Sequence, residues 1–154
     1  MSIPSINIEQ VQSVTGGELH LNNSSHKIIT QLLTDSRKVV NAESSLFFAI
    51  NGDNHNGHEF ISDLINAGVF NFIISDKTAW KETYTANAIV VTDPLLAMQQ
   101  LAASHRNRFR IPVIGITGSN GKTVVKEWLY QLLREDKNIV RSPKSYNSQI
   151  GVPL

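Results

Sequence analysis

Compact apolar runs and apolar residues at helical spacing follow one another along the chain, a pattern that predicts alternating strands and helices. The compact runs predict strands at 18–21, 28–34, 46–50, 69–74 and 88–92. Helical spacing predicts helices at 7–14, at about 60–65 and from 94 to about 108. This alternation is typical of an α/β domain.

Capping signals define where the predicted helices begin and end. The Asn7 side chain can cap the first helix, and Gly16 with Gly17 can stop it. Asp93 followed by Pro94 is a strong start for the third helix. The residues of the third helix that we expect to be buried are Leu95, Met98, Leu101 and Ala102.

Residues 106–112 mark a boundary, because the third helix ends in basic residues and Pro112 disfavours its continuation. Beyond it the sequence predicts a strand at 113–117, a helix at 122–135 and another strand from 138, as in a parallel sheet. The buried face of that helix is predicted to comprise Val124, Val125, Trp128, Leu129, Leu132 and Leu133. We therefore expect one domain at 1–108 and a second, incomplete one at 111–154.

The composition excludes several kinds of chemistry. A formal net charge of +1 gives no basic excess for a nucleic-acid-binding surface. Without cysteine there are no disulfides and no thiolate metal sites. The N-terminus lacks a signal-peptide pattern, and no apolar run approaches the roughly 20 residues that span a bilayer. We expect a cytoplasmic protein that neither binds nucleic acid nor inserts into membranes; its oligomeric state is left open.

A glycine-containing loop between the strand at 113–117 and the helix at 122–135 carries the clearest chemistry. The residues are Thr117, Gly118, Ser119, Asn120, Gly121, Lys122 and Thr123. The strict P-loop pattern requires glycine where this chain has Ile116, but the context of strand, loop and helix is right. Glycines let successive backbone N–H groups surround an anion at the positive end of a helix. The bland alternative is a simple turn, which the Gly-Lys-Thr triplet disfavours.

This loop predicts ATP and Mg²⁺ as cofactors. Lys122 can reach the terminal phosphates and is the predicted catalytic residue. The hydroxyl of Thr123 is placed where it can bind a phosphate-linked Mg²⁺.

Four blocks of the chain resemble the Mur ligases. The loop 117–123 is similar to their short ATP loop, and 34–39 to the Asp-Ser-Arg segment of their N-terminal domain. Residues 46–61 resemble the block that follows, with Asn56 in place of the commoner aspartate. Residues 147–154 resemble the run typical of members that add D-alanyl-D-alanine, including versions fused to alanine racemase. The chain departs from the family at 41–45 and at 124–125.

The resemblance implies a small N-terminal α/β substrate domain followed by the start of a P-loop-type parallel-sheet ATP domain. It further implies an ATP-dependent ligase of peptidoglycan precursor synthesis whose substrates are UDP-N-acetylmuramoyl-tripeptide and D-alanyl-D-alanine. Its implied substrate-binding residues are Asp35, Ser36, Arg37, Asn56, Gly57, His58 and Asn147. The third residue of the peptide is left open, and we expect the isolated chain to be inactive.

Several residues have bland interpretations that the sequence leaves beside the functional ones. Asp35 to Arg37 could be a turn with a surface ion pair, although Arg37 suits a diphosphate. His55 and His58 lack further metal ligands at convincing spacing, so we expect no metal there. Trp128 is predicted to pack in a core rather than stack on a base. The alternative functions are another amino-acid ligase of the same family or a binding module without catalysis.

Overall fold

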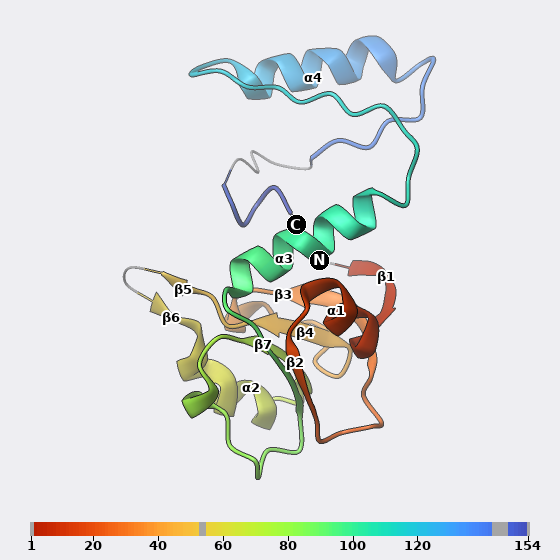
Figure 1. Ribbon diagram of the computed structural model, residues 1–154. Helices are drawn as coiled ribbons and strands as arrows, with labels where there is room; N and C mark the ends of the chain where they lie inside the picture. Colours follow the sequence, from red (N-terminus) through yellow and green to blue (C-terminus); the bar gives the residue numbers. More distant parts are fainter. Residues whose placement is uncertain (1, 53–54, 143–147, 154) are drawn as a thin grey trace. The chain divides into compact units, whose positions relative to one another are not determined.

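A six-stranded mixed sheet forms the centre of the first part of the chain in the computed structural model (Figure 1), which describes residues 2–52, 55–142 and 148–153. The sheet order is β1-β3-β4-β7-β8-β2. The strands are β1 Ser2–Asn7, β2 Glu18–Leu21, β3 Ile28–Leu33, β4 Ser45–Phe48, β7 Asn71–Ile74 and β8 Asn87–Val90. The five strands predicted before residue 93 are therefore confirmed, as is the α/β fold class.

The four central strands are parallel, and each edge strand is antiparallel to its neighbour. The sequence analysis missed the edge strand β1, which carries Pro4. Proline lacks an N–H group and is tolerated in edge strands, so β1 has little of the usual strand signature. Parallel strands end at the same edge of a sheet, and the loops after β3, β4 and β7 therefore meet there.

Three helices accompany this sheet: α1 Ile8–Thr15, α2 Ile61–Asn66 and α3 Pro94–Arg106. The predicted caps are confirmed. The Asn7 side chain accepts a hydrogen bond from Glu9 N at 2.8 Å, and α1 ends at Gly16 in the left-handed region. The Asp93 side chain accepts one from Leu95 N at 2.7 Å. Of the residues expected to be buried on α3, Met98 and Leu101 are buried, whereas Leu95 and Ala102 are half-buried.

The apolar core lies on both faces of the sheet, as expected for parallel strands. One face packs with α2 and includes Phe47, Phe72 and Leu64. Alternation along the strands turns Leu46 and Ile73 to the opposite face, where α1 and α3 contact each other and α3 contacts β4 and β7. This packing fixes the carboxyl ends of the parallel strands.

Short segments occupy those carboxyl ends. The 3₁₀ turn η1, Ser36–Lys38, follows β3, and the hairpin β5 Asn51–Gly52 with β6 His55–Asn56 follows β4. The 3₁₀ turn η2, Gly57–Phe60, then leads into α2, and η3, Lys77–Ala79, follows β7. These turns bring the two predicted substrate segments to one edge of the sheet.

Residues 109–152 form a separate unit. Its helix, α4 Lys122–Leu133, confirms the predicted one. The predicted strands at 113–117 and from 138 are wrong, because the described residues of this unit form no strand. A strand needs a hydrogen-bonded neighbour, and a single strand–loop–helix unit supplies none.

The prediction of a buried α4 face is also wrong. Trp128 is 63% exposed and Leu132 is 74% exposed, and no residue of α4 is buried. The helical spacing of its apolar residues is real, but no other apolar element among the described residues of this unit covers them. Trp128 is therefore not a core residue of this chain.

Charge and length give no sign of a membrane span. No described helix has both the length and the apolar character needed to cross a bilayer.

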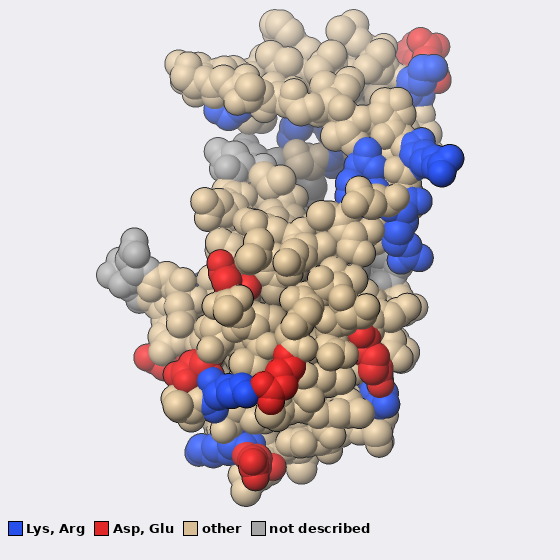
Figure 2. All heavy atoms as spheres, in the orientation of Figure 1, with Lys and Arg blue, Asp and Glu red and all other residues tan. Residues whose placement is uncertain are grey.

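Figure 2 shows blue and red side chains interspersed over the lower part of the view, where the sheet lies. Ion pairs in this unit include Lys27–Glu9 and Lys77–Glu18.

Candidate functional site

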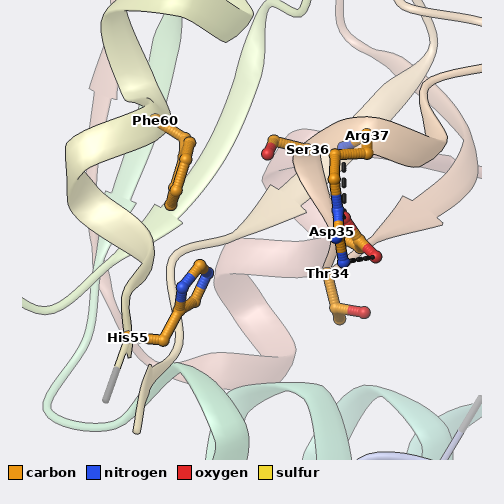
Figure 3. A pocket seen from close by; sticks show the side chains of 6 residues that line it. All are labelled: Thr34, Asp35, Ser36, Arg37, His55 and Phe60. Atoms are coloured by element: carbon orange, nitrogen blue, oxygen red, sulfur yellow. Dashed lines mark hydrogen bonds and ion pairs between the residues drawn. The ribbon is translucent and has the colours of Figure 1, made fainter.

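A pocket of about 480 Å³ opens between the segment after β3 and the segment around β6 and η2. Its lining residues are Thr34, Asp35, Ser36, Arg37, His55 and Phe60. Figure 3 shows the Ser36 side chain pointing across the pocket toward Phe60, with His55 beside it. The structure thus brings together the two segments that the sequence analysis selected for substrate binding.

Asp35 and Arg37 form a close ion pair at the rim of this pocket. Arg37 donates from Nε to Asp35 Oδ1 at 2.8 Å and from Nη2 to Oδ2 at 2.9 Å. The Asp35 carboxylate also accepts from the Arg37 backbone N–H at 3.1 Å and caps η1. The bland interpretation of this segment, a turn with a surface ion pair, therefore describes the geometry in the structure.

The ion pair with Asp35 leaves Arg37 able to bind a further anion. Its side chain is 87% exposed, and hydrogen bonding to Arg37 holds the pKa of Asp35 well below the ordinary value. Asp35 therefore stays ionised and orients the guanidinium, whose remaining N–H groups can donate to another anion. Lys38 also approaches Asp35, at 3.3 Å from Oδ2, but does not line the pocket.

The opposite wall is an aromatic pair that the sequence analysis did not assign to substrate. The rings of His55 and Phe60 stack with centroids 5.0 Å apart and an interplanar angle of 25°. His55 was considered only as a metal ligand, and Phe60 only as part of a helical pattern. The described residues contain no cluster of three or more potential metal ligands.

The predicted substrate residues Asn56, Gly57 and His58 are not among the residues that line this pocket. The Asn56 side chain caps η2 by accepting from His58 N at 3.0 Å. Gly57 is buried, and a Cβ there would lie 2.7 Å from backbone atoms of Ala49 and Ile50. His58 is 6% exposed. These three residues shape the loop and do not line the pocket.

The backbone of the glycine loop in the second unit has two positions that favour glycine. Gly118 has φ 145° and Gly121 has φ 77°, both in the region that favours glycine. Gly121 is the N-cap of α4 and supplies no side-chain cap. The first N–H groups of α4 therefore lack the usual capping side chain, which suits an anion at this helix end.

Lys122 folds back over this loop. Its Nζ donates to the Gly118 carbonyl and lies 3.5 Å from the Ser119 carbonyl. The ammonium group is therefore already at the loop that it is predicted to serve. Thr123 lies in the first turn of the same helix. Asn147, the last predicted substrate residue, lies outside the described residues.

Comparison with known proteins identifies the family. Residues 28–106, about half of the chain, match the profile of the Mur ligase family, catalytic domain. The chain belongs to this family. The match covers the pocket segments and ends before the glycine loop, so it does not test the loop.

Individual relatives are similar over most of this chain. UDP-N-acetylmuramoyl-tripeptide–D-alanyl-D-alanine ligase of Synechocystis sp. is 38% identical over 136 residues, or 88% of this chain and 29% of that protein. Crystal structure I of MurF from Acinetobacter baumannii matches 99% of this chain and 33% of its own, with a TM-score of 0.86 and 28% identity.

A third relative contains nucleotide. The MurF ligase of Thermotoga maritima, solved in complex with ADP, matches 80% of this chain and 28% of its own, with a TM-score of 0.70 and 29% identity. This chain thus spans at most 33% of the length of these three relatives.

Proposed function

We propose that this chain works as part of a full-length ATP-dependent ligase, of its relatives' length, that joins D-alanyl-D-alanine to UDP-N-acetylmuramoyl-tripeptide. The observation that carries the proposal is the likeness of the chain to MurF ligases in both sequence and structure. The order of domains would be a UDP-substrate domain at 1–108 followed by an ATP domain that begins at 111. Because ATP is the co-substrate, the proposed reaction takes place in the cytoplasm.

In this proposal the pocket of the first unit binds the UDP end of the substrate. Ser36 offers a hydroxyl inside the pocket, and Arg37 offers an exposed guanidinium at its rim. A guanidinium is suited to paired hydrogen bonds with a diphosphate. The stacked rings of His55 and Phe60 give the pocket an apolar wall. Asn147 remains a predicted substrate residue on the grounds of resemblance alone.

The glycine loop would hold the phosphates of ATP. Backbone N–H groups of residues 117–123 would donate to phosphate oxygens, and Lys122 would exchange its loop carbonyls for the terminal phosphates. The Thr123 hydroxyl would help to hold Mg²⁺, which supplies further charge neutralisation. The tripeptide carboxylate would attack the terminal phosphorus of ATP and release ADP, giving an acyl phosphate. The amine of D-alanyl-D-alanine would then displace phosphate and lose a proton to form the amide. Lys122 would stabilise the charge of the transferring phosphoryl group.

The Arg37→Ala substitution tests the pocket assignment. We expect it to weaken binding of UDP-N-acetylglucosamine to this chain by about 10- to 100-fold, because a charge-assisted hydrogen bond is lost. Thermal stability should change little, since the Arg37 side chain is 87% exposed. Calorimetry measures both effects. Lys38→Ala is the matched control, because Lys38 also contacts Asp35 without lining the pocket; equal weakening by both variants would contradict the role of Arg37.

The choice of amine separates this ligase from another member of the family. The block 147–154 favours D-alanyl-D-alanine, although Asn147 lies outside the described residues. Incubation of the full-length ligase with ATP, the UDP-tripeptide and a mixture of D-alanyl-D-alanine with single amino acids should give the dipeptide adduct. Preferential incorporation of a single amino acid would assign the chain to a neighbouring ligase. Binding of both substrates without any product would support a non-catalytic module.

A further inference from the structure

His58 is held in one protonation state by four neighbours. Its Nε2 lies 3.0 Å from Ser75 N and 3.2 Å from Asp76 N. Backbone N–H groups can only donate, so Nε2 accepts from both and carries no proton. Nδ1 lies 3.1 Å from both Asn51 Oδ1 and Asn56 Oδ1, and therefore donates its proton to these oxygens. The ring is neutral, with its single proton on Nδ1.

These hydrogen bonds connect two segments that follow different strands. Asn51 and Asn56 belong to the hairpin β5–β6 after β4, whereas Ser75 and Asp76 follow β7. The close approach of Gly57 to the backbone after β4 leaves no room for the segment to shift inward. The buried His58 ring is thus the connection between the hairpin and the carboxyl end of β7.

The same segment carries the aromatic wall of the pocket. His55 precedes His58 by three residues and Phe60 follows it by two, and both line the pocket while His58 does not. We infer that His58 is a positioning residue that, in its neutral form, holds the stacked His55 and Phe60 rings in place opposite Ser36 for the UDP substrate. The identity of the ligand in this inference rests on the proposed function of the pocket. The positioning of the two rings by His58 does not depend on that function.

Protonation would break this connection. A proton on Nε2 would face two N–H donors, so both hydrogen bonds would be lost and the backbone amides of Ser75 and Asp76 would lose this acceptor. Burial lowers the pKa of His58 from its ordinary value of 6.5. The ring is therefore neutral at pH 6.5 and above. The connection is lost as the pH falls through the lowered pKa of His58.

The charged surroundings of His58 are few among the described residues. Asp76 opposes the effect of burial by attracting a proton, but it is the minor influence on the His58 pKa. His55 and Glu59 lie on the same segment, and Lys77 is held in an ion pair with β2. The hairpin strands contribute only uncharged asparagines to the ring. Of these groups, His55 is the second histidine and lines the pocket, so the variants must separate its contribution from that of His58.

His58→Gln and His58→Ala separate these effects. The side-chain oxygen of glutamine can accept from the two amides, but it does not titrate in this range. We expect wild-type chain, titrated from pH 8 to pH 4.5, to show a joint shift of the Ser75 and Asp76 amide resonances with unchanged far-UV circular dichroism. Over the same range its affinity for UDP-N-acetylglucosamine, whose diphosphate does not titrate there, should fall by at least about tenfold.

The variants give opposite outcomes. In His58→Gln both the amide resonances and the affinity should stay constant with pH, whereas His58→Ala should bind at least about tenfold more weakly at every pH. The same pH dependence in His58→Gln as in wild type would show that the effect does not come from His58 and would overturn the inference. If neither the wild-type chain nor either variant binds UDP-N-acetylglucosamine, the proposed function of the pocket is wrong. The amide resonances then still decide whether His58 makes the connection.

Discussion

Replacing Lys122 with alanine in the full-length ligase is expected to lower the rate of ligation by at least roughly 10²–10³-fold. The reason is that Lys122 is the cation already held at the loop, through the carbonyls of Gly118 and Ser119. Without it, negative charge on the transferring phosphoryl group would be met by backbone N–H groups and Mg²⁺ alone. Product formation from the UDP-tripeptide, D-alanyl-D-alanine and ATP measures the loss.

The control for this prediction is Lys137→Ala. Lys137 is an exposed lysine beyond the end of α4, far along the chain from the glycine loop. The Lys137→Ala substitution removes the same charge as Lys122→Ala. Ligation should stay within about twofold of wild type, since distant exposed charges interact weakly. Circular dichroism should show that both variants keep the wild-type fold. Wild-type turnover in Lys122→Ala would contradict the catalytic role of this lysine.

Phe72→Ala is expected to have the largest effect on stability. Phe72 is fully buried on β7 and contacts Phe47, at 6.1 Å between ring centroids, and Trp80, at 5.7 Å. Truncation of a buried phenylalanine costs about 3–5 kcal/mol in free energy of unfolding, because a cavity is left behind. The midpoint of thermal unfolding of the sheet unit should fall by at least about 10 °C.

The control lies in the same unit. Leu96 on α3 is 47% exposed, so Leu96→Ala removes apolar atoms without opening a buried cavity. Its unfolding free energy should change by less than about 1 kcal/mol. Denaturant unfolding followed by circular dichroism compares the two variants. Similar losses in both would mean that the Phe72 environment is not the rigid core described above.

The first unit was predictable because its signals are local. Asn7, Asp93 and the glycine after α1 act on the residues next to them, and the apolar runs at 46–50 and 69–74 mark buried strands. Strand order was not predicted, because pairing joins residues far apart in the sequence. The weak edge strand β1 was missed for the same reason: its partner β3, not its own sequence, makes it a strand.

Predictions for the second unit were wrong where the predicted structure needs a partner element. The helical spacing around Trp128 correctly predicted α4, but burial needs another apolar surface, and the described residues of this unit provide none. The strands predicted at 113–117 and from 138 likewise lack neighbours with which to pair. Sequence patterns state what a segment prefers; they do not supply the elements that would satisfy it.

The site was predicted in part. Resemblance selected residues 35–37 and 56–58; the pocket is lined by 35–37, whereas across from them it is lined by His55 and Phe60 and not by 56–58. It did not distinguish residues that line the pocket from those that support it. His55 and Phe60 line it, whereas His58 is buried and does not line it. The order of polar and aromatic residues along 55–60 gave no sign of which side chains face inward, because a 3₁₀ turn follows directly on a two-residue strand.

The central claim is that residues 117–123 bind the phosphates of ATP. A crystal structure of the full-length ligase with ADP and Mg²⁺ tests it most directly. We predict phosphate oxygens within hydrogen-bonding distance of the loop N–H groups and of Lys122 Nζ, with the Thr123 hydroxyl turned toward the metal. Nucleotide phosphates bound elsewhere, with Lys122 still hydrogen-bonded to the Gly118 carbonyl, would contradict the account.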